Sequence, residues 1–269
     1  QQEQFKKNLS SIFKIILKRT KELTLPKQIP DISNSLLPTV SIVTLVFNRR
    51  RFFRLSKLNF LSIDYPKDKL EWVIIDDSKS SEKVKDLVPQ EKNVHYLEYT
   101  EHLTIGNKRN LAIEKCTHDY ICFMDDDDYY PPESVRKRIN SILHYKKSCV
   151  TCTTIGCFHI NKFISMINVP PHQLSFENRI SEASLAFSKI FWEKQKFNDN
   201  SIGGEAREFL VDRYDKCCEI NWEGVIVSLM HTCNTSDKVT MSDKPNGCHY
   251  NFSNKLFTFL TSLDNQKKS

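Results

Sequence analysis

The sequence predicts an α/β fold with a mostly parallel sheet flanked by helices, and three observations carry this prediction. Short, nearly continuous apolar runs alternate with helical patterns between residues 41 and 147, which is the order expected of right-handed βαβ units. The apolar runs do not alternate with polar residues, so we expect these strands to be covered on both faces. After Cys149 the alternation gives way to short β-like runs, which predict a smaller, mixed β region.

The predicted elements follow one another in a regular order. We expect strands at 41–47, 71–76, 94–99 and 120–124, and helices at 52–61, 81–88, 105–116 and 132–147. Pro89 limits the second helix, and Pro132 suits the first turn of the fourth. Beyond Cys149 we expect a helix near 187–195, a turn at Gly203-Gly204, a helix from about Ala206 and a strand near 225–230.

Residues 1–37 predict an N-terminal amphipathic helix and a proline-containing tether, followed by a main domain at 38–269. Apolar residues recur at helical spacing among lysines in residues 4–24, which is typical of an amphipathic helix. Pro26, Pro30 and Pro38 then prevent one continuous helix. The helix could lie on a membrane surface or on a partner, or it could pack back on its own domain.

The net charge of +6 comes mainly from this N-terminal segment. Residues 1–30 contain seven basic and two acidic side chains, so the remaining 239 residues are nearly neutral. A nearly neutral domain argues against nucleic acid as a partner. We find no apolar run as long as a membrane span and no leader pattern, so we expect at most peripheral membrane contact, through residues 4–24.

The nine cysteines show no regular framework, which favours a reducing, cytoplasmic compartment over a disulfide-bonded secreted fold. Cys149 and Cys152 have the spacing of half a zinc site, with Cys157 and His159 nearby. They lie in an apolar, β-rich run, however, and no second Cys-x-x-Cys motif follows. Buried free thiols are therefore the favoured interpretation.

Four consecutive aspartates, Asp125–Asp128, follow the predicted strand at 120–124. Ligands of open α/β sheets bind beyond the carboxyl ends of the strands. Two such charges about 6 Å apart repel by roughly 3 kcal/mol at an effective dielectric constant near 20, which favours a hard divalent ion such as Mg²⁺ or Mn²⁺. An EF-hand is excluded because Tyr130 and Arg136 stand where it needs Gly and Glu. A solvated acidic turn is the alternative.

Three further motifs are expected near the same edge of the sheet. Asp76-Asp77 ends the second strand and offers acceptors to a base or a ribose, or else only precedes a helix N-cap at Ser78 or Ser80. Lys108 and Arg109 begin a helix and suit a phosphate, or else form an exposed charged face. Glu205, after a glycine pair, can act as a general base, or else only stabilise a helix start.

Together these motifs resemble the GT-A-fold (Rossmann-like) nucleotide-sugar glycosyltransferases, above all the inverting family 2 enzymes. The matching segments are SIVTLVFN (41–48), VIIDDS (73–78), NKRNLAIEKC (107–116), YICFMDDDDYYPPESV (120–135) and GGEAREF (203–209). The resemblance covers residues 38 to 235, approximately. It implies a nucleotide-binding half at 38–148 and an acceptor-side half at 149–269.

The resemblance also implies which residues bind the donor. Phe47 would stack on the nucleobase, and Asp77 would recognise the uracil ring with Asp76 beside it. Arg109, together with Lys108, would face the donor. Asp126 would face the ribose.

The metal and the base follow from the same resemblance. Asp125 and Asp127 match the outer carboxylates of the DxD signature, and Asp127 is the expected direct metal ligand. His231 lies where some members supply a further ligand, and His249 is a weaker candidate. Glu205 resembles the catalytic base, although Ala206 follows it where many members carry a second acid.

The implied reaction is metal-dependent transfer of a sugar, with Mn²⁺ or Mg²⁺, from a UDP-sugar to an acceptor hydroxyl with inversion. The acceptor would be a glycan, a protein or a lipid. A Gln-x-x-Arg-Trp run is absent from the sequence, which disfavours a processive synthase. A metal-dependent nucleotidyltransferase and a non-catalytic binding module with a basic N-terminal arm remain the alternatives. The Lys-, Asn-, Ile- and Ser-rich composition fits an AT-rich viral or bacterial genome.

Overall fold

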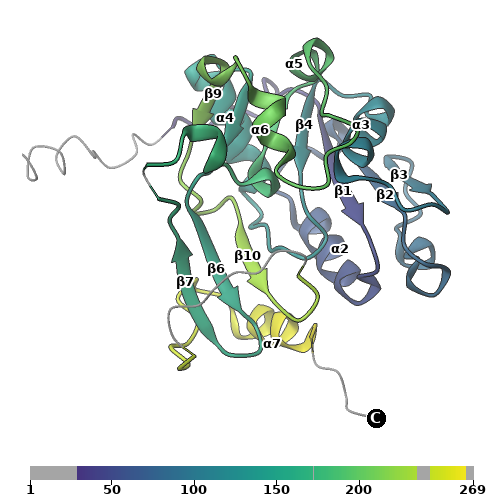
Figure 1. The fold of residues 1–269 in the computed structure, drawn as a ribbon, viewed down its shortest axis with the longest axis vertical. Coiled ribbons are helices and arrows are strands. Elements are labelled where there is room, and N and C mark those ends of the chain that lie inside the picture. The colour runs from purple at the N-terminus through teal and green to yellow at the C-terminus, as the bar shows by residue number, and fades with distance from the viewer. Residues whose placement is uncertain (1–28, 172, 235–242, 265–269) are drawn as a thin grey trace, which may run out of the picture. The chain divides into compact units, whose positions relative to one another are not determined.

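The computed structural model describes residues 29–171, 173–234 and 243–264. The helix predicted for residues 4–24 lies outside this part of the chain. The larger compact unit spans Ile32–Ser269 and contains two β-sheets (Figure 1). Its first residues already join the core, because Leu37 is buried and the ammonium group of Lys69 donates to the Leu37 carbonyl oxygen at 2.6 Å.

The large sheet has seven strands in the order β3-β2-β1-β4-β8-β5-β9. Its strands are β1 (Val40–Val46), β2 (Leu70–Asp76), β3 (Val94–Glu98), β4 (Tyr120–Phe123), β5 (Cys149–Thr151), β8 (Ala186–Ser188) and β9 (Cys217–Glu219). Strands β1 to β4 are mutually parallel, and only β8 runs antiparallel to its neighbours β4 and β5. This confirms the predicted α/β fold with a mostly parallel sheet.

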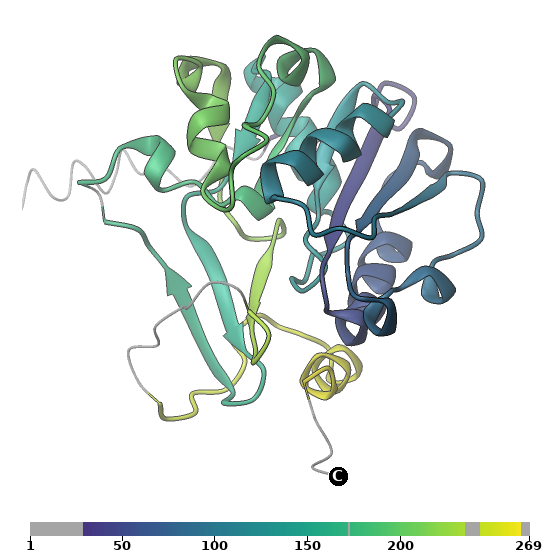
Figure 2. The same cartoon turned by 45° about the vertical axis from the view of Figure 1, so that its right-hand side comes forward.

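Helices cover both faces of this sheet, as the continuous apolar strands predict (Figure 2). Ile42 and Trp72 point to one face, and Val43 and Phe123 point to the other. The first face packs against α2 (Phe53–Ser62) and α4 (Ser134–Tyr145), and the second against α3 (Ile105–Lys115), α5 (Lys189–Lys194) and α6 (Glu205–Leu210). All residues of β1 and β2 are buried, because period-2 alternation sends apolar side chains to both covered faces.

The smaller sheet confirms the predicted mixed β region. It consists of β6 (Ile155–His159), β7 (Ile164–Asn168) and β10 (Val227–Met230), with β10 parallel and β7 antiparallel to β6. The half of the domain from residue 149 onward therefore builds this sheet and also adds β5, β8 and β9 to the large one.

Helix α7 (Asn254–Ser262) packs on the smaller sheet. Leu260 contributes to one core cluster with Leu229 of β10. Directly after the helix, the carboxylate of Asp264 accepts a hydrogen bond from the Thr232 backbone N–H at 2.9 Å and pairs with Arg51 at 2.5 Å. The end of α7 is thus tied to the loops that follow β10 and β1.

The helix predicted at 81–88 is wrong, since the chain forms two short 3₁₀ turns there, Ser80–Glu82 and Lys85–Leu87. The cause is a set of contacts to the end of β2. Asp76 Oδ2 accepts from the Val84 backbone N–H at 3.0 Å, and Lys83 Nζ donates to the Asp76 carbonyl oxygen at 2.9 Å. These contacts hold the segment against the sheet and interrupt the helical hydrogen-bond ladder.

The cysteines of the proposed half zinc site lie in the core of the domain. Cys149, Cys152 and Cys157 are fully buried. Among the helices of the described residues, none combines the length and the apolar character that crossing a bilayer requires.

Gly156 in β6 is packed against an aromatic ring, and a methyl group there would overlap it. A Cβ at this position would lie 2.5 Å from the Trp222 ring. We expect Gly156→Ala to lower the free energy of unfolding by about 1–3 kcal/mol, which urea denaturation would measure. Gly203→Ala is the control, because no atom of the described residues lies within 4 Å of its Cβ. Equal losses in both variants would contradict the prediction.

Candidate active site

The backbone of the four aspartates is fixed by β1 and α2. Met124, just before them, donates to the Val43 carbonyl oxygen at 3.0 Å. Ser56 Oγ donates to the Asp126 carbonyl oxygen at 3.1 Å, and Asn59 Nδ2 to that of Asp128 at 2.9 Å. Side chains of α2 therefore replace the strand partners that this loop lacks, and they hold it at the carboxyl end of β4.

The four carboxylates have different surroundings. Asp128 Oδ1 accepts from Ser228 Oγ at 2.8 Å and from the Leu229 backbone N–H at 2.9 Å, and so joins the loop to β10. Asp125 and Asp127 line a cavity, and Asp126 is fully buried beneath it. Burial raises the pKa of Asp125 above its usual range, an effect that Arg109 opposes.

Arg49, in the loop after β1, pairs with two of these aspartates. Its Nη2 lies 2.6 Å from Asp126 Oδ1, and its Nη1 contacts Asp127 Oδ2. Burial disfavours the charged guanidinium, but the aspartates outweigh this effect and raise the pKa of Arg49. Burial likewise raises the pKa of Asp126 well above its usual range, against the opposing charge of Arg49. The sequence analysis missed Arg49, for which a basic run after the first strand was the available signal.

His231 follows β10 and reaches the same carboxylate, with its Nε2 3.2 Å from Asp127 Oδ2. Its Nδ1 accepts the Cys233 backbone N–H at 3.1 Å, so the neutral ring carries its proton on Nε2 and donates it to Asp127. His231 therefore orients Asp127 in this arrangement. His249 is exposed and lies beside β7, where its backbone N–H donates to Ser165 Oγ at 3.0 Å.

Asp127, with Asp125 nearby, fits a magnesium- or manganese-type site that substrate completes, whereas both ring nitrogens of His231 are used by other groups in this arrangement. Among the described residues, no group of three His, Cys, Asp or Glu side chains converges as a ready-made metal site. Mg²⁺ is usually held by one or two carboxylates together with water and substrate phosphates. Asp127, at the cavity wall with Asp125 nearby, offers such a partial ligand set.

The predicted nucleobase residues come together at the ends of β1 and β2. Lys108 Nζ contacts Asp77 Oδ1 and lies 5.1 Å from the centre of the Phe47 ring. Asp77 Oδ2 also accepts from the Leu103 backbone N–H at 2.9 Å and lies 2.8 Å from His102 Nδ1. The His102 ring stacks on Phe47 with 4.1 Å between ring centres. The sequence analysis missed His102, whose place in the loop after the third strand was the only signal.

Asp76 does not contact this group, because its hydrogen bonds are made with other residues. It is fully buried and accepts from the backbone N–H groups of Ser78 and Val84 and from the Tyr96 hydroxyl, at 2.9, 3.0 and 2.8 Å. These three bonds use both carboxylate oxygens to hold the end of β2. The contacts of Asp76 therefore support a structural role at the end of β2.

Glu205 and Arg109 form a buried ion pair below the cavity. Glu205 begins α6, and its Oε1 accepts from Arg109 Nε at 2.5 Å. Both side chains are 2% exposed. The guanidinium lies 4.0 Å from the centre of the Phe123 ring, and no described residue accepts from its buried Nη1. Arg109 thus holds Glu205 in place and keeps one donor group free of protein partners.

Glu182 is the carboxyl group that the sequence analysis missed. It lines the cavity with Glu205, in a 3₁₀ turn before β8. Burial and then the nearby charge of Glu205 raise the pKa of Glu182 to about 7. A carboxyl group that titrates near neutral pH can take up a proton under physiological conditions.

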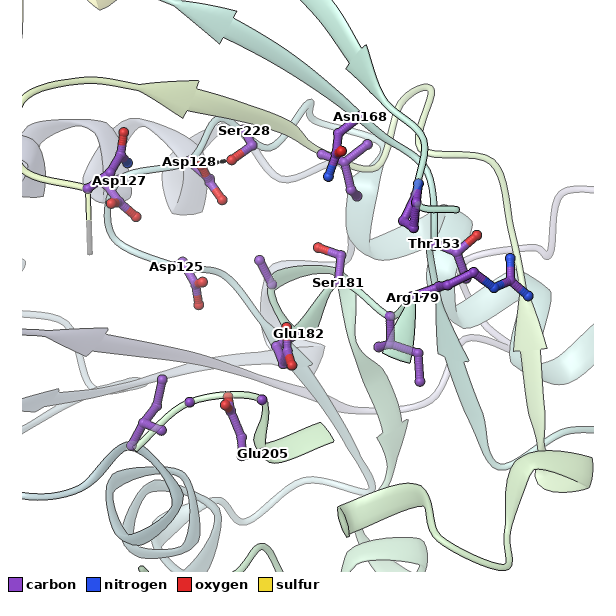
Figure 3. Close-up of a pocket in the computed structure, with 18 of the residues that line it drawn as sticks. Asp125, Asp127, Asp128, Thr153, Asn168, Arg179, Ser181, Glu182, Glu205 and Ser228 are labelled. Carbon is purple, nitrogen blue, oxygen red and sulfur yellow. Dashed lines mark hydrogen bonds between the residues drawn. The ribbon is translucent and has the colours of Figure 1, made fainter. Parts of the chain in front are cut away.

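One cavity of about 640 Å³ lies between the aspartate loop and α6, and its lining includes Arg49, Arg109, Asp125, Asp127, Glu182 and Glu205. The predicted nucleobase residues Phe47, Asp77 and Lys108 are not among the residues that line it, and neither are Asp126 and His231. Figure 3 shows Asp125, Asp127 and Asp128 along one side of it, with Glu182 and Glu205 across from them. The wall toward the smaller sheet combines Ile155 and Cys157 of β6 with polar residues and prolines, among them Thr153, Asn168, Pro170, Arg179 and Ser181. The cavity can therefore hold a polyanionic ligand at the strand ends and a polar molecule beside it.

Comparison with known proteins agrees with this geometry. Residues 41–200 match the family model described as glycosyl transferase family 2. The chain belongs to this family. The matched segment includes the aspartate loop and Arg109, and it ends just before Glu205.

Two curated relatives of the chain are also named as glycosyltransferases. An uncharacterized glycosyltransferase of Haemophilus influenzae is 28% identical over 110 residues, which cover 40% of this chain and 43% of that protein. A putative teichuronic acid biosynthesis glycosyltransferase, TuaG of Bacillus subtilis, is 25% identical over 116 residues, covering 42% and 44%. The match thus spans less than half the length of either relative.

Two solved structures share the fold at lower identity. The mannosyltransferase PcManGT of Pyrobaculum calidifontis, in complex with GDP-Man and Mn²⁺, superposes with a TM-score of 0.58 at 16% identity and covers 82% of this chain and 65% of its own. S. aureus TarS (residues 1–349), in complex with UDP-GlcNAc, gives 0.59 at 15% identity, covering 75% and 62%. These likenesses confirm the predicted GT-A fold.

We expect the stability of the domain to depend on the charge of Glu182. Its folded-state pKa is about 7 against an ordinary value of 4.5, so folding loses stability as the pH rises from the lower to the higher value. Glu182→Gln removes this loss. We therefore compare the difference in melting temperature, variant minus wild type, at two pH values. We expect this difference to be at least about 2 °C larger at about pH 8 than at about pH 5. A constant difference across this range would contradict the assignment.

Proposed function

We propose that this family 2 domain transfers a sugar from a UDP-sugar to an acceptor hydroxyl, with a divalent metal ion and with inversion of the anomeric carbon. The observation that carries the proposal is the aspartate loop, which faces Glu205 and Glu182 across one cavity. Structural neighbours with nucleotide-sugars bound, GDP-Man with Mn²⁺ in one and UDP-GlcNAc in another, support it.

Two groups of residues would bind the donor. Phe47 offers an aromatic face to the base, and Asp77 offers carboxylate oxygens to a base N–H, once His102 moves off the ring. Asp126 lies nearest the ribose in this proposal. Lys108 and Arg109 supply positive charge where the diphosphate would pass, and Arg109 has a buried donor group available for it.

Asp127, with Asp125 and His231 beside it, would hold the metal ion, Mn²⁺ or Mg²⁺. A bound divalent ion neutralises the negative charge that develops on the departing nucleoside diphosphate. His231 would keep Asp127 oriented through its ring N–H. The number of protein ligands is small, which leaves coordination positions open for phosphate oxygens.

Glu205 would accept the proton of the acceptor hydroxyl. Its Oε1 is held by Arg109, which leaves Oε2 for the hydroxyl and fixes its direction. The hydroxyl oxygen then attacks the anomeric carbon from the face opposite the diphosphate, and this single displacement inverts the configuration. Glu182 is a second proton acceptor in reach of the same space, and its pKa of about 7 favours it on chemical grounds.

The acceptor, whether a glycan, a protein or a lipid, would enter along the wall formed by Thr153, Asn168 and Arg179. This wall is polar, which suits a hydroxyl-rich acceptor. Peripheral membrane contact through residues 4–24 stays a prediction from the sequence.

Asp127→Asn tests the metal-dependent part of the proposal. We expect Mn²⁺-dependent turnover of a UDP-sugar to fall at least about 100-fold, because the metal contributes several kcal/mol to stabilising the leaving group. Turnover is measured as UDP release, with and without EDTA. Asp86→Asn is the control, since Asp86 is exposed and pairs with Arg50 instead. Release of sugar 1-phosphate in place of UDP, with transfer of UMP to the acceptor, would assign the protein to nucleotidyl transfer.

Glu205→Gln and Glu182→Gln separate the two proton acceptors. Loss of the general base should lower kcat by about 10²–10⁴-fold while the UDP affinity stays within about twofold. We expect this result for Glu205→Gln and a smaller decrease for Glu182→Gln. The reverse order would transfer the role to Glu182, and full activity in both would refute a carboxylate base in this cavity.

A further inference from the structure

The strongest feature outside the family motifs is Arg49, the first of three consecutive arginines after β1. Arg50 pairs with exposed Asp86, and Arg51 pairs with Asp264 at the end of α7. Of the three, in the part of the chain that the structure describes, Arg49 alone lines the cavity. Its side chain is 16% exposed, so the backbone directs one arginine inward and two outward.

Arg49 contacts the same oxygen that the proposed metal ion would need. Its guanidinium bridges Asp126 Oδ1 and Asp127 Oδ2, and His231 reaches the same Asp127 oxygen. A divalent ion and a guanidinium close to the same carboxylate oxygen repel each other, so each weakens the binding of the other. Arg49 and the metal ion are therefore competitors for Asp127.

Arg49 also has a donor group that no protein atom uses. Among the described residues, none accepts from its buried Nε, just as none accepts from Nη1 of Arg109 in the same cavity. A buried guanidinium N–H without an acceptor costs free energy, which a suitable ligand would recover. A diphosphate offers several charged acceptor oxygens in the planar arrangement that arginine binds best.

We propose that Arg49 is a binding residue for the donor's diphosphate, which it reaches by exchanging Asp127 for phosphate oxygens. The proposal rests on the proposed function of this site. When the diphosphate draws Arg49 away, Asp127 becomes available to the metal ion. Metal and nucleotide consequently bind cooperatively, and each raises the affinity for the other by the same factor, because binding free energies are linked.

The competition between Arg49 and the metal ion predicts that loss of Arg49 changes metal affinity and nucleotide affinity in opposite directions. Removing a cationic side chain from a nucleotide site should weaken nucleotide binding, yet here it should strengthen metal binding in the absence of nucleotide. A residue with a merely structural role would not produce this pair of opposite changes. The readout is equilibrium binding, so it does not depend on activity of the metal-loaded enzyme.

Titration calorimetry on the full chain tests this with Mn²⁺ alone, UDP alone, and Mn²⁺ at saturating UDP. We expect Arg49→Gln to bind Mn²⁺ alone at least about 5-fold more tightly than wild type, and UDP in the presence of Mn²⁺ at least about 5-fold more weakly. The factor by which UDP raises the Mn²⁺ affinity should fall at least about 5-fold, within the usual range of such couplings. Arg50→Gln is the matched control and should leave all three values unchanged.

Arg49→Lys keeps the test decisive if Arg49→Gln does not fold. A lysine ammonium retains the charge but cannot bridge two carboxylates in the same way, so Mn²⁺ alone should again bind more tightly than in wild type. Unchanged or weaker Mn²⁺ binding in the folded variant overturns the proposal. If the wild-type protein binds Mn²⁺ and UDP but the coupling factor is unchanged in both variants, only the proposed role of Arg49 is refuted. Wild-type protein that binds neither ligand refutes the proposed function itself.

Discussion

The pairing of buried acidic side chains with buried cations is the constraint on which this site depends. Lys108 contacts Asp77, Arg109 holds Glu205, and Arg49 bridges two aspartates after β4. A charged group with almost no access to water is tolerated only when a partner of opposite charge and hydrogen bonds replace the lost hydration. Each pair also joins segments far apart in the sequence, so the same interactions that permit the buried charges position the loops around the cavity.

The fold was largely predictable because strands that are buried on both faces appear in the sequence as continuous apolar runs. β1 and β2 are buried along their whole length, and their apolar runs indicate a covered parallel strand. The helix expected at 81–88 failed for a non-local reason: Asp76 and Lys83 draw that segment onto the end of β2. Local propensity carries no information about such contacts.

The site was predictable only where a motif marks it. Asp77, Lys108, Asp127 and Glu205 were found because they stand at the ends of predicted strands or at helix starts. Arg49, His102 and Glu182 were missed because their importance arises from interactions across 23 or more positions, as between Glu182 and Glu205 or between His102 and Asp77. Asp76 and Asp77 illustrate the limit best: they are adjacent, yet one carboxylate accepts from backbone N–H groups of its own segment and the other pairs with the side chains of Lys108 and His102.

Position 206 shows how the family motif has been altered in this protein. Ala206 is fully buried in the core cluster that includes Phe209 and Leu210, so an acidic side chain there would need a different packing of α6. The glutamates that line the cavity are Glu205, at the first turn of α6, and Glu182 on a separate segment. The two carboxylates thus lie on two separate elements, so a substitution can alter the position of one without altering the other.

Asp264 links the last helix to the chemistry without lining the cavity. It contacts Arg51, two residues from Arg49, and Thr232, next to His231. Arg49 and His231 both contact Asp127. The final turn of the described chain therefore supports the two residues that contact Asp127 Oδ2, and removing this turn would disturb that carboxylate while every motif of the family stayed intact.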